Sequence, residues 1–166
     1  ETDMRLFEKL CLESFQSGLS WRTILAKRDN FRAAFNDFDF HRMAGFTPKD
    51  VDRLLQNEGI VRHRGKIEAV INNARCAQKL VEQEGSLATF VWRYEPDPHT
   101  RIEPQTRSTS AESIALSKDL KKRGWKFVGP TTVYAFMQAM GLINDHEENC
   151  VVRVRVEQAR NRFKRP

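Results

Sequence analysis

A glutamate stands among apolar residues close to the start of the chain, within the stretch LCLESFQSGLSW at residues 10–21. Glu13 follows Leu10 by three residues and Leu6 by seven, so a helix would place its carboxylate on their apolar face. Burying a carboxylate without a partner is costly. Geometry alone favours a structural glutamate that pairs with an arginine or turns to solvent, because structural ion pairs outnumber functional ones. The alternative is a carboxylate that serves a binding pocket.

A short glycine-containing segment joins two helical patterns in KKRGWKFVGPTTVYAFMQA, residues 121–139. The arrangement is typical of a helix-hairpin-helix, in which Gly129 lets the backbone approach a phosphate closely. The N-terminus of the second helix then presents free N–H groups, and nearby residues such as Lys126 add attraction that does not depend on DNA sequence. An ordinary helix pair with a glycine turn would show the same pattern, so the motif alone does not decide the function.

Two residues of the types that bind zinc stand near residue 150. His146 and Cys150 are four residues apart and would share one face of a helix. Both are good zinc ligands, but a structural zinc ion takes four. By themselves they indicate half of a site.

The elements that must position these groups are helical nearly throughout. Residues 95–110 are polar and hold Pro96, Pro98 and Pro104, so we expect a loop there that separates two helical halves. No alternating strand pattern of useful length is present, and the predicted fold class is all-α. Helices are predicted by apolar spacing and capping residues around residues 6–10, 21–35, 47–59, 67–85, 110–123 and 131–140.

Composition favours one soluble globular domain. The chain has 166 residues, 40% of them hydrophobic, and no apolar run long enough to cross a membrane. Its three widely spaced cysteines do not suggest a disulfide framework, so we expect a reducing cytoplasm. The chain lacks an initiator methionine and its helical periodicity begins at once. We therefore expect that residues of the domain precede Glu1.

The net charge of +6 comes mostly from one end of the chain. Residues 151–166 hold six lysines or arginines and one glutamate, and contribute five of those six charges. The high isoelectric point is therefore weak evidence that the folded part binds nucleic acid. We expect a single helical domain over residues 1–150, incomplete at its N-terminus, followed by a basic and disordered tail over 151–166.

Four blocks taken together are more specific than any single motif. LFEKLCLESFQSGLSW, GIVRHRGKI, LSKDLKKRGWKFVGPTTVYAFMQAMGLINDH and the final His-x-x-x-Cys occur in this order. Over residues 1 to about 150 they resemble the 3-methyladenine DNA glycosylase I family of the helix-hairpin-helix glycosylase superfamily. The resemblance implies a monomeric enzyme that excises 3-methyladenine from alkylated double-stranded DNA, the first step of base excision repair. Thr131 and Thr132 stand where a Schiff-base lyase would need a lysine, so water is the expected nucleophile.

The resemblance also implies roles for individual residues. Methylation at N3 makes adenine cationic, and Glu13 would attract that charge in a dry pocket without protonating the leaving group. Trp21 would stack on the flipped base, although a tryptophan in the core is the plain alternative. Phe15 and Gln16 would shape the pocket wall. The remaining residues expected at the DNA are the turn residues Gly18 and Leu19, as an apolar wedge, and the hairpin residues Lys126, Gly129 and Thr131.

Two features of the resemblance concern the end of the domain. Related glycosylases carry a catalytic aspartate near the position of Asp145, which would otherwise cap a local turn. In the family, residues matching His146 and Cys150 join a cysteine and a histidine of the N-terminal segment to bind a structural zinc ion. That segment, with its pocket aromatic residues, has no counterpart in this chain, so zinc would have only a half-site and the chemistry would need no metal.

Other functions compatible with the sequence are a non-catalytic DNA-binding module that uses the hairpin and tail, and a helical interaction protein. Glu13 separates the first of these from an enzyme, because a carboxylate close to anionic DNA does not help a protein that only binds it.

Overall fold

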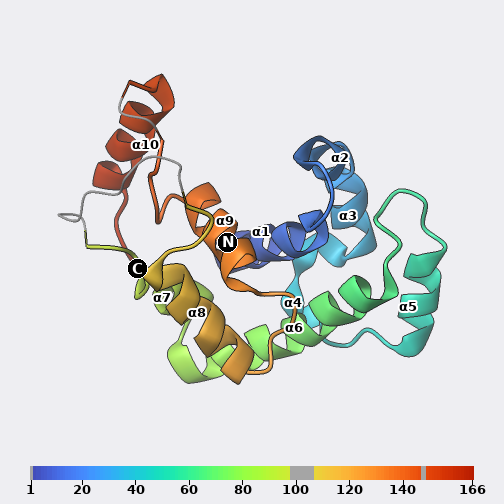
Figure 1. Ribbon diagram of the computed structural model, residues 1–166. Coiled ribbons are helices and arrows are strands. Elements are labelled where there is room, and N and C mark those ends of the chain that lie inside the picture. Colours follow the sequence, from blue (N-terminus) through green and yellow to red (C-terminus); the bar gives the residue numbers. More distant parts are fainter. Residues whose placement is uncertain (1, 98–106, 147–148) are drawn as a thin grey trace.

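The computed structural model describes residues 2–97, 107–146 and 149–166, and every regular element in these ranges is a helix (Figure 1). This confirms the all-α prediction. The elements are α1 (Thr2–Gln16), α2 (Trp21–Ala26), α3 (Arg28–Ala34), the 3-10 helix η1 (Asn36–Phe38), α4 (Phe40–Met43), α5 (Pro48–Leu55), α6 (Arg64–Glu84), α7 (Leu87–Trp92), α8 (Ala111–Lys122), α9 (Pro130–Ala139) and α10 (Val151–Arg162).

Local sequence signals set most of the helix ends. Thr47 caps α5 through a capping box with Asp50, and Ser110 caps α8 in the same way. Gly85 ends α6 with a φ of 88°, a conformation that costs glycine little. The predicted helix over 21–35 is instead two helices, which meet at Lys27. Of the predicted loop over 95–110, residues 98–106 lie outside the described ranges.

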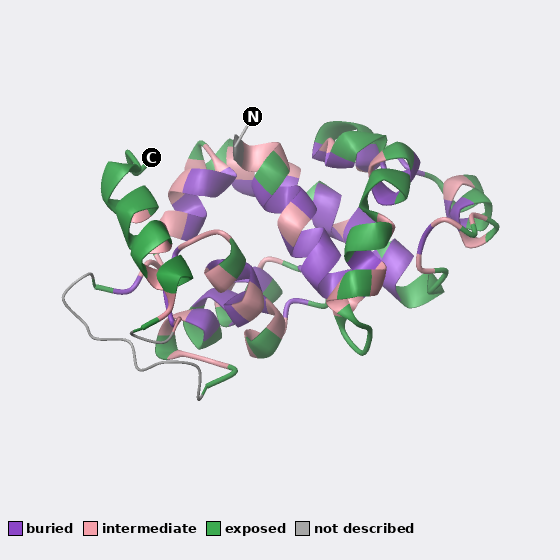
Figure 2. Cartoon of the chain, turned by 90° about the horizontal axis from the view of Figure 1, so that it is seen from above, coloured by how far each residue is buried: buried purple, intermediate pink, exposed green. Residues whose placement is uncertain are grey.

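Helix α1 runs through the middle of the molecule and positions the candidate site. It packs against α9, α6, α7 and α2, and Figure 1 shows it with these helices around it. The side chains of Leu6 and Phe7 are fully buried, and Figure 2 shows buried residues concentrated where the central helices meet. A helix packed on several sides buries most of its own circumference, which is why even polar residues of α1 are buried.

The C-terminal segment differs from the sequence prediction. Residues 151–162 form α10 rather than a disordered tail, although most of this helix is exposed (Figure 2). The Arg160 guanidinium lies 3.2 Å from the Glu95 carboxylate, and the Phe163 ring packs 5.1 Å from the Trp92 ring. These contacts compensate for the conformational entropy lost on ordering the helix. The domain boundary at residue 150 stays a prediction.

Within the described ranges, no helix has the length and apolar character that a membrane span requires.

Candidate active site

A pocket of about 380 Å³ lies where α1, α2 and α9 meet the segment that follows α9. Two of the residues singled out in the sequence, Glu13 on α1 and Trp21 on α2, both line it. Asp145 and His146, which follow α9, also belong to the lining. The full lining is Lys9, Glu13, Trp21, Ala135, Gln138, Ala139, Ile143, Asp145 and His146.

The Glu13 carboxylate is buried, as the helical spacing predicts. Its side chain is 2% exposed, and its Oε1 lies 3.3 Å from the Lys9 ammonium one helical turn earlier. Its Oε2 is buried and has no hydrogen-bond partner among the described residues. Burial raises the pKa of Glu13, and the charge and hydrogen bond of Lys9 partly oppose that shift. A buried carboxylate that belongs to the pocket lining and has one unsatisfied oxygen is suited to a ligand that carries positive charge.

Trp21 begins α2 and offers one face of its ring to the same pocket. Ser20 caps the helix by accepting a hydrogen bond from the Thr23 amide, which sets where the tryptophan emerges. The Lys9 ammonium lies 3.9 Å from the centroid of the Trp21 ring. The indole is half-buried rather than in the core, so its ring is positioned for stacking and for a cation–π contact.

Asp145 is buried beside the pocket and held by α9. The Tyr134 hydroxyl donates a 3.0 Å hydrogen bond to Asp145 Oδ2, and the Gln138 amide donates to the same oxygen. Burial, followed by the hydrogen bond to Asp145, raises the pKa of Tyr134 to about 12, so the phenol keeps its proton. Asp145 therefore lines the pocket and is also hydrogen-bonded to two side chains of α9. The sequence had suggested a cap of a local turn as the structural alternative for this residue.

Phe15 and Gln16, which were expected to shape the pocket wall, are not among the residues that line this pocket. Phe15 is fully buried, and its ring packs 4.8 Å from that of Phe31 in the core. Gln16 instead donates from its side-chain amide to the Leu19 carbonyl, 2.8 Å away. Two residues correspond to about 200° of helix rotation, so Phe15 must face away from Glu13.

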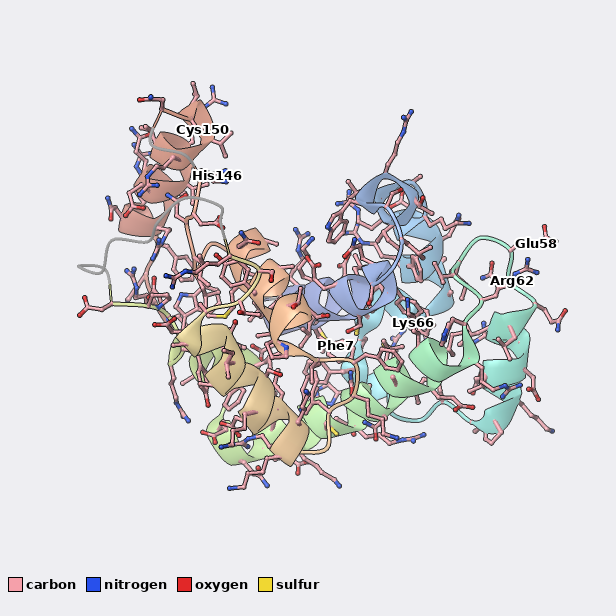
Figure 3. The ribbon with its side chains drawn as sticks, viewed as in Figure 1. Phe7, Glu58, Arg62, Lys66, His146 and Cys150 are labelled. Atoms are coloured by element: carbon pink, nitrogen blue, oxygen red, sulfur yellow. The ribbon has the colours of Figure 1, made fainter. Side chains whose placement is uncertain are left out.

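The turn between α1 and α2 presents Leu19 to solvent. Gly18 has a φ of 81°, which favours glycine, and Leu19 is 37% exposed. The ammonium of Lys66 on α6 donates to the carbonyls of Phe15 and Ser17, at 3.1 Å and 2.7 Å. Lys66 therefore fixes the end of α1 and the start of the turn (Figure 3).

The loop between α8 and α9 is held from behind by side chains of neighbouring helices. Asn73 on α6 donates to the Lys126 carbonyl and accepts from the Lys126 amide, at 2.8 Å and 2.9 Å. Ser14 on α1 donates to the carbonyl of Phe127, whose exposed ring packs 6.4 Å from that of His63. The loop thus lies beside both the end of α1 and the start of α6.

Gly129 caps the N-terminus of α9 with an ordinary φ of −63°, so its backbone does not require glycine. A Cβ added there would meet no atom of the protein within 4 Å. Thr131 follows in the first turn of α9 and is exposed. The open space in front of Gly129 is compatible with the close approach of an external group.

His146 and Cys150 do not form a metal site in the described residues. Neither lies in a helix, since Cys150 precedes α10, and both stand on the chain leading into α10 (Figure 3). Among residues 2–97, 107–146 and 149–166, no three His, Cys, Asp or Glu side chains come together to hold a metal ion. Two donors do not satisfy tetrahedral zinc, so the described residues do not fit the ion.

Two polar residues of the pocket lining, Lys9 and Gln138, were not expected from the sequence. The spacing of Lys9, four residues before Glu13, was a signal for an ion pair. Lys66 belongs to a local cluster of basic residues in the sequence, but its contact with the turn was not expected. No local signal indicates Gln138 or the partners of Lys66, because their contacts depend on how α9 and α6 pack against α1.

Comparison with known proteins agrees with this geometry. The family model for methyladenine glycosylase matches residues 1–154. The chain belongs to the methyladenine glycosylase family. It is 49% identical over 156 residues to DNA-3-methyladenine glycosylase 1 of Escherichia coli strain K12, covering 90% of this chain and 83% of that relative. DNA-3-methyladenine glycosylase of Haemophilus influenzae is 45% identical over 150 residues, covering 88% and 81%.

Solved structures of this family share the fold. A 3-methyladenine DNA glycosylase I from Staphylococcus aureus superposes with a TM-score of 0.85 at 38% identity, covering 91% of this chain and 82% of that one. A variant of 3-methyladenine DNA glycosylase I in complex with 3-methyladenine also gives 0.85 at 38% identity, covering 91% and 83%. The all-α architecture is therefore that of 3-methyladenine DNA glycosylase I, as the sequence resemblance implies.

Proposed function

We propose that this protein hydrolyses the N-glycosidic bond of 3-methyladenine in alkylated double-stranded DNA, the first step of base excision repair. The observation that carries the proposal is the pairing of the buried Glu13 carboxylate with the Trp21 ring in one pocket. Family membership at 49% identity supports the same substrate, because the named relatives are 3-methyladenine glycosylases.

The chemistry follows from the charge of the substrate. Methylated adenine is a cation, and Glu13 would accept hydrogen bonds from its edge while Trp21 stacks on its face. Water adds its oxygen to C1′ of the sugar and releases a proton to solvent. The C1′–N9 bond breaks with its electron pair passing to the base, which leaves as neutral 3-methyladenine. Glu13 lowers the energy of the bound cation and needs to donate no proton.

Asp145 is the second candidate for a direct catalytic role. It lines the same pocket, where a carboxylate would stabilise positive charge on the sugar or activate water. Its Oδ2 already accepts hydrogen bonds from Tyr134 and Gln138. Oδ1 is therefore the oxygen that would contact the sugar or the water. We place it after Glu13, whose Oε2 has no competing donor.

DNA would be held by the face on which three segments converge. Leu19 would enter the gap left by the flipped nucleotide, and Gly18 gives its turn the necessary backbone freedom. The α8–α9 loop would act as a helix-hairpin-helix, with Lys126, Gly129 and Thr131 near the phosphates. The exposed His63, which caps α6, packs against Phe127 of that loop, and the exposed Arg62 precedes it in the chain and adds basic character.

The remaining expectations belong to the same proposal. Cytoplasmic location is supported by three cysteines that are all free thiols. We expect the protein to act as a monomer. No chemical step above depends on a metal ion.

The test is release of free 3-methyladenine from methylated duplex DNA. Glu13→Gln keeps the shape and removes the charge, and we expect release to fall about 10- to 100-fold, because a hydrogen bond to a charged group is worth about 1.5–3 kcal/mol. Binding to undamaged DNA should persist. Glu82→Gln, an exposed residue of α6, makes the same chemical change away from the pocket and should not alter release. DNA binding without any release by the unmodified chain would favour the non-catalytic binding module.

A further inference from the structure

Lys9 contacts both Glu13 and Trp21, the two residues that bind the cationic base in the proposed function. Its ammonium lies 3.3 Å from Glu13 Oε1 and 3.9 Å from the centroid of the Trp21 ring. The side chain is 26% exposed, although the flexible stem of a lysine normally carries its charge out to water. A lysine that serves only a helical ion pair has no reason to cover an indole ring as well.

These two contacts are those that a bound methyladenine cation would make. A positive charge between a carboxylate and an aromatic face gains from both the Coulomb and the cation–π interaction. The free protein already holds a positive charge in that position. Two cations would repel each other if both lay against the Glu13 carboxylate and the same face of the Trp21 ring, whichever carboxylate oxygen the second one used.

We infer that Lys9 is a resident cation that fills the base-binding position in the free enzyme and is displaced by the methylated base. The inference rests on the proposed function, since it takes Glu13 and Trp21 as the base-binding groups. It makes Lys9 a residue that determines specificity rather than one that performs chemistry.

The displacement has a consequence for recognition. A cationic base that expels the ammonium restores a positive charge beside Glu13, so the buried carboxylate stays compensated. A neutral adenine that expelled it would leave Glu13 buried without a cation, which is costly. Displacement of the Lys9 ammonium therefore costs free energy that only a positively charged ligand recovers. Asp145 and His146 are the other titratable groups in the lining, and neither contacts Lys9 through an ion pair in the described structure.

The experiment compares a permanent cation with a neutral ligand of nearly the same shape. The probes are 3,9-dimethyladeninium, which carries the charge of the methylated nucleotide, and 9-methyladenine. Binding is measured by calorimetry at pH 8, well on the alkaline side of the ordinary pKa of a carboxylate. Lys9→Met removes the charge at similar length, Lys9→Arg keeps a cation, and Lys79→Met makes the same change at an exposed position of α6 outside the pocket lining.

We expect Lys9→Met to bind 3,9-dimethyladeninium about five- to tenfold more tightly than the unmodified protein, since the ligand no longer pays for loss of the ion pair and ring contact. Lys9→Arg and Lys79→Met should bind it as the unmodified protein does. In the unmodified protein, the Lys9 ε-methylene protons should show an upfield ring-current shift from Trp21. Saturation with the cation should abolish that shift, and 9-methyladenine should leave it in place.

The inference and the proposed function fail in different ways. If the cation binds in a Glu13-dependent manner while the Lys9 signal keeps its shift, or if Lys9→Met gains no affinity, Lys9 is a structural partner and the inference is overturned. If the cation does not bind, or binds equally to Glu13→Gln, the base-binding site is wrong and both proposals fall. The proton signal is read on the unmodified protein, so the test holds even if Lys9→Met folds poorly.

Discussion

Glu13 combines burial, one ionic partner and one unsatisfied oxygen, and this combination makes it sensitive to pH. Burial raises its pKa from the ordinary value of 4.5, with Lys9 opposing the shift. The carboxylate is needed in its charged form, so activity is present above the raised pKa and lost as pH falls through it.

We therefore predict an acid limb in the pH profile of kcat/KM that lies above pH 4.5. Release of 3-methyladenine measured across pH reports it directly. Glu13→Gln should lack the limb, because glutamine does not titrate, whereas Glu82→Gln should retain it. An unchanged limb in Glu13→Gln would show that the titrating group is not Glu13.

At the scale of elements, the α1–α2 turn depends on one buried lysine from a distant helix. Lys66 is 8% exposed, and its ammonium donates hydrogen bonds to the carbonyls of Phe15, near the end of α1, and Ser17, which follows α1. Burial lowers the pKa of Lys66. The charged ammonium is the form that donates to the two carbonyls.

Lys66→Met should lower the free energy of unfolding by about 1–3 kcal/mol, because the buried Phe15 carbonyl and the part-buried Ser17 carbonyl lose their donor. It should also weaken binding to duplex DNA, since the turn carrying Leu19 is no longer fixed. Thermal unfolding and DNA titration measure the two effects, with Lys79→Met as the matched control. Full DNA affinity in a destabilised Lys66→Met protein would remove the turn from the DNA-binding face.

The α8–α9 loop allows a sharper test, because its glycine is not required by the fold. Gly129 has an ordinary φ and open space in front of it, so Gly129→Ala should change stability by no more than about 0.5 kcal/mol. The added methyl group should still weaken DNA binding if a phosphate approaches there. Gly45→Ala, whose Cβ would meet only the Arg42 carbonyl at 3.5 Å, is the control. Equal DNA affinity of both variants would argue against a phosphate contact at Gly129.

At the scale of the whole molecule, most of the net positive charge lies on residues that do not line the pocket. Most of the net positive charge belongs to residues 151–166, whereas the pocket lining ends at His146. Helix α10 is largely exposed (Figure 2). It contacts the rest of the molecule through Glu95 and Trp92, and its Arg153 donates to the carbonyl of His146 at the edge of the pocket lining. Its charges can therefore contribute long-range attraction to DNA without touching the base.

Replacing Arg155, Arg162 and Lys164 together by glutamine should weaken binding to undamaged DNA at low ionic strength and reduce its salt dependence. Release at about 0.15 M salt should stay within about twofold, because exposed charges beyond a Debye length are screened. DNA titrations at several salt concentrations test the first expectation and release assays test the second. Loss of release at this salt would place α10 at the site itself.

The sequence alone determined the features that depend on local periodicity and local caps. Glu13 is buried because it falls on the stripe of Leu6 and Leu10, and α5 and α8 begin where Thr47 and Ser110 can cap them. The same periodicity would also have excluded Phe15 from the pocket, since helix rotation turns it into the core.

The tertiary structure alone decided which groups meet across helices. Lys9 reaches Trp21 only because α2 folds back against α1, and Asp145 joins the pocket only because α9 packs along α1. Lys66 and Asn73 act on loops that lie about fifty residues away in the chain. Such contacts are fixed by the packing of whole helices, which no short stretch of sequence encodes.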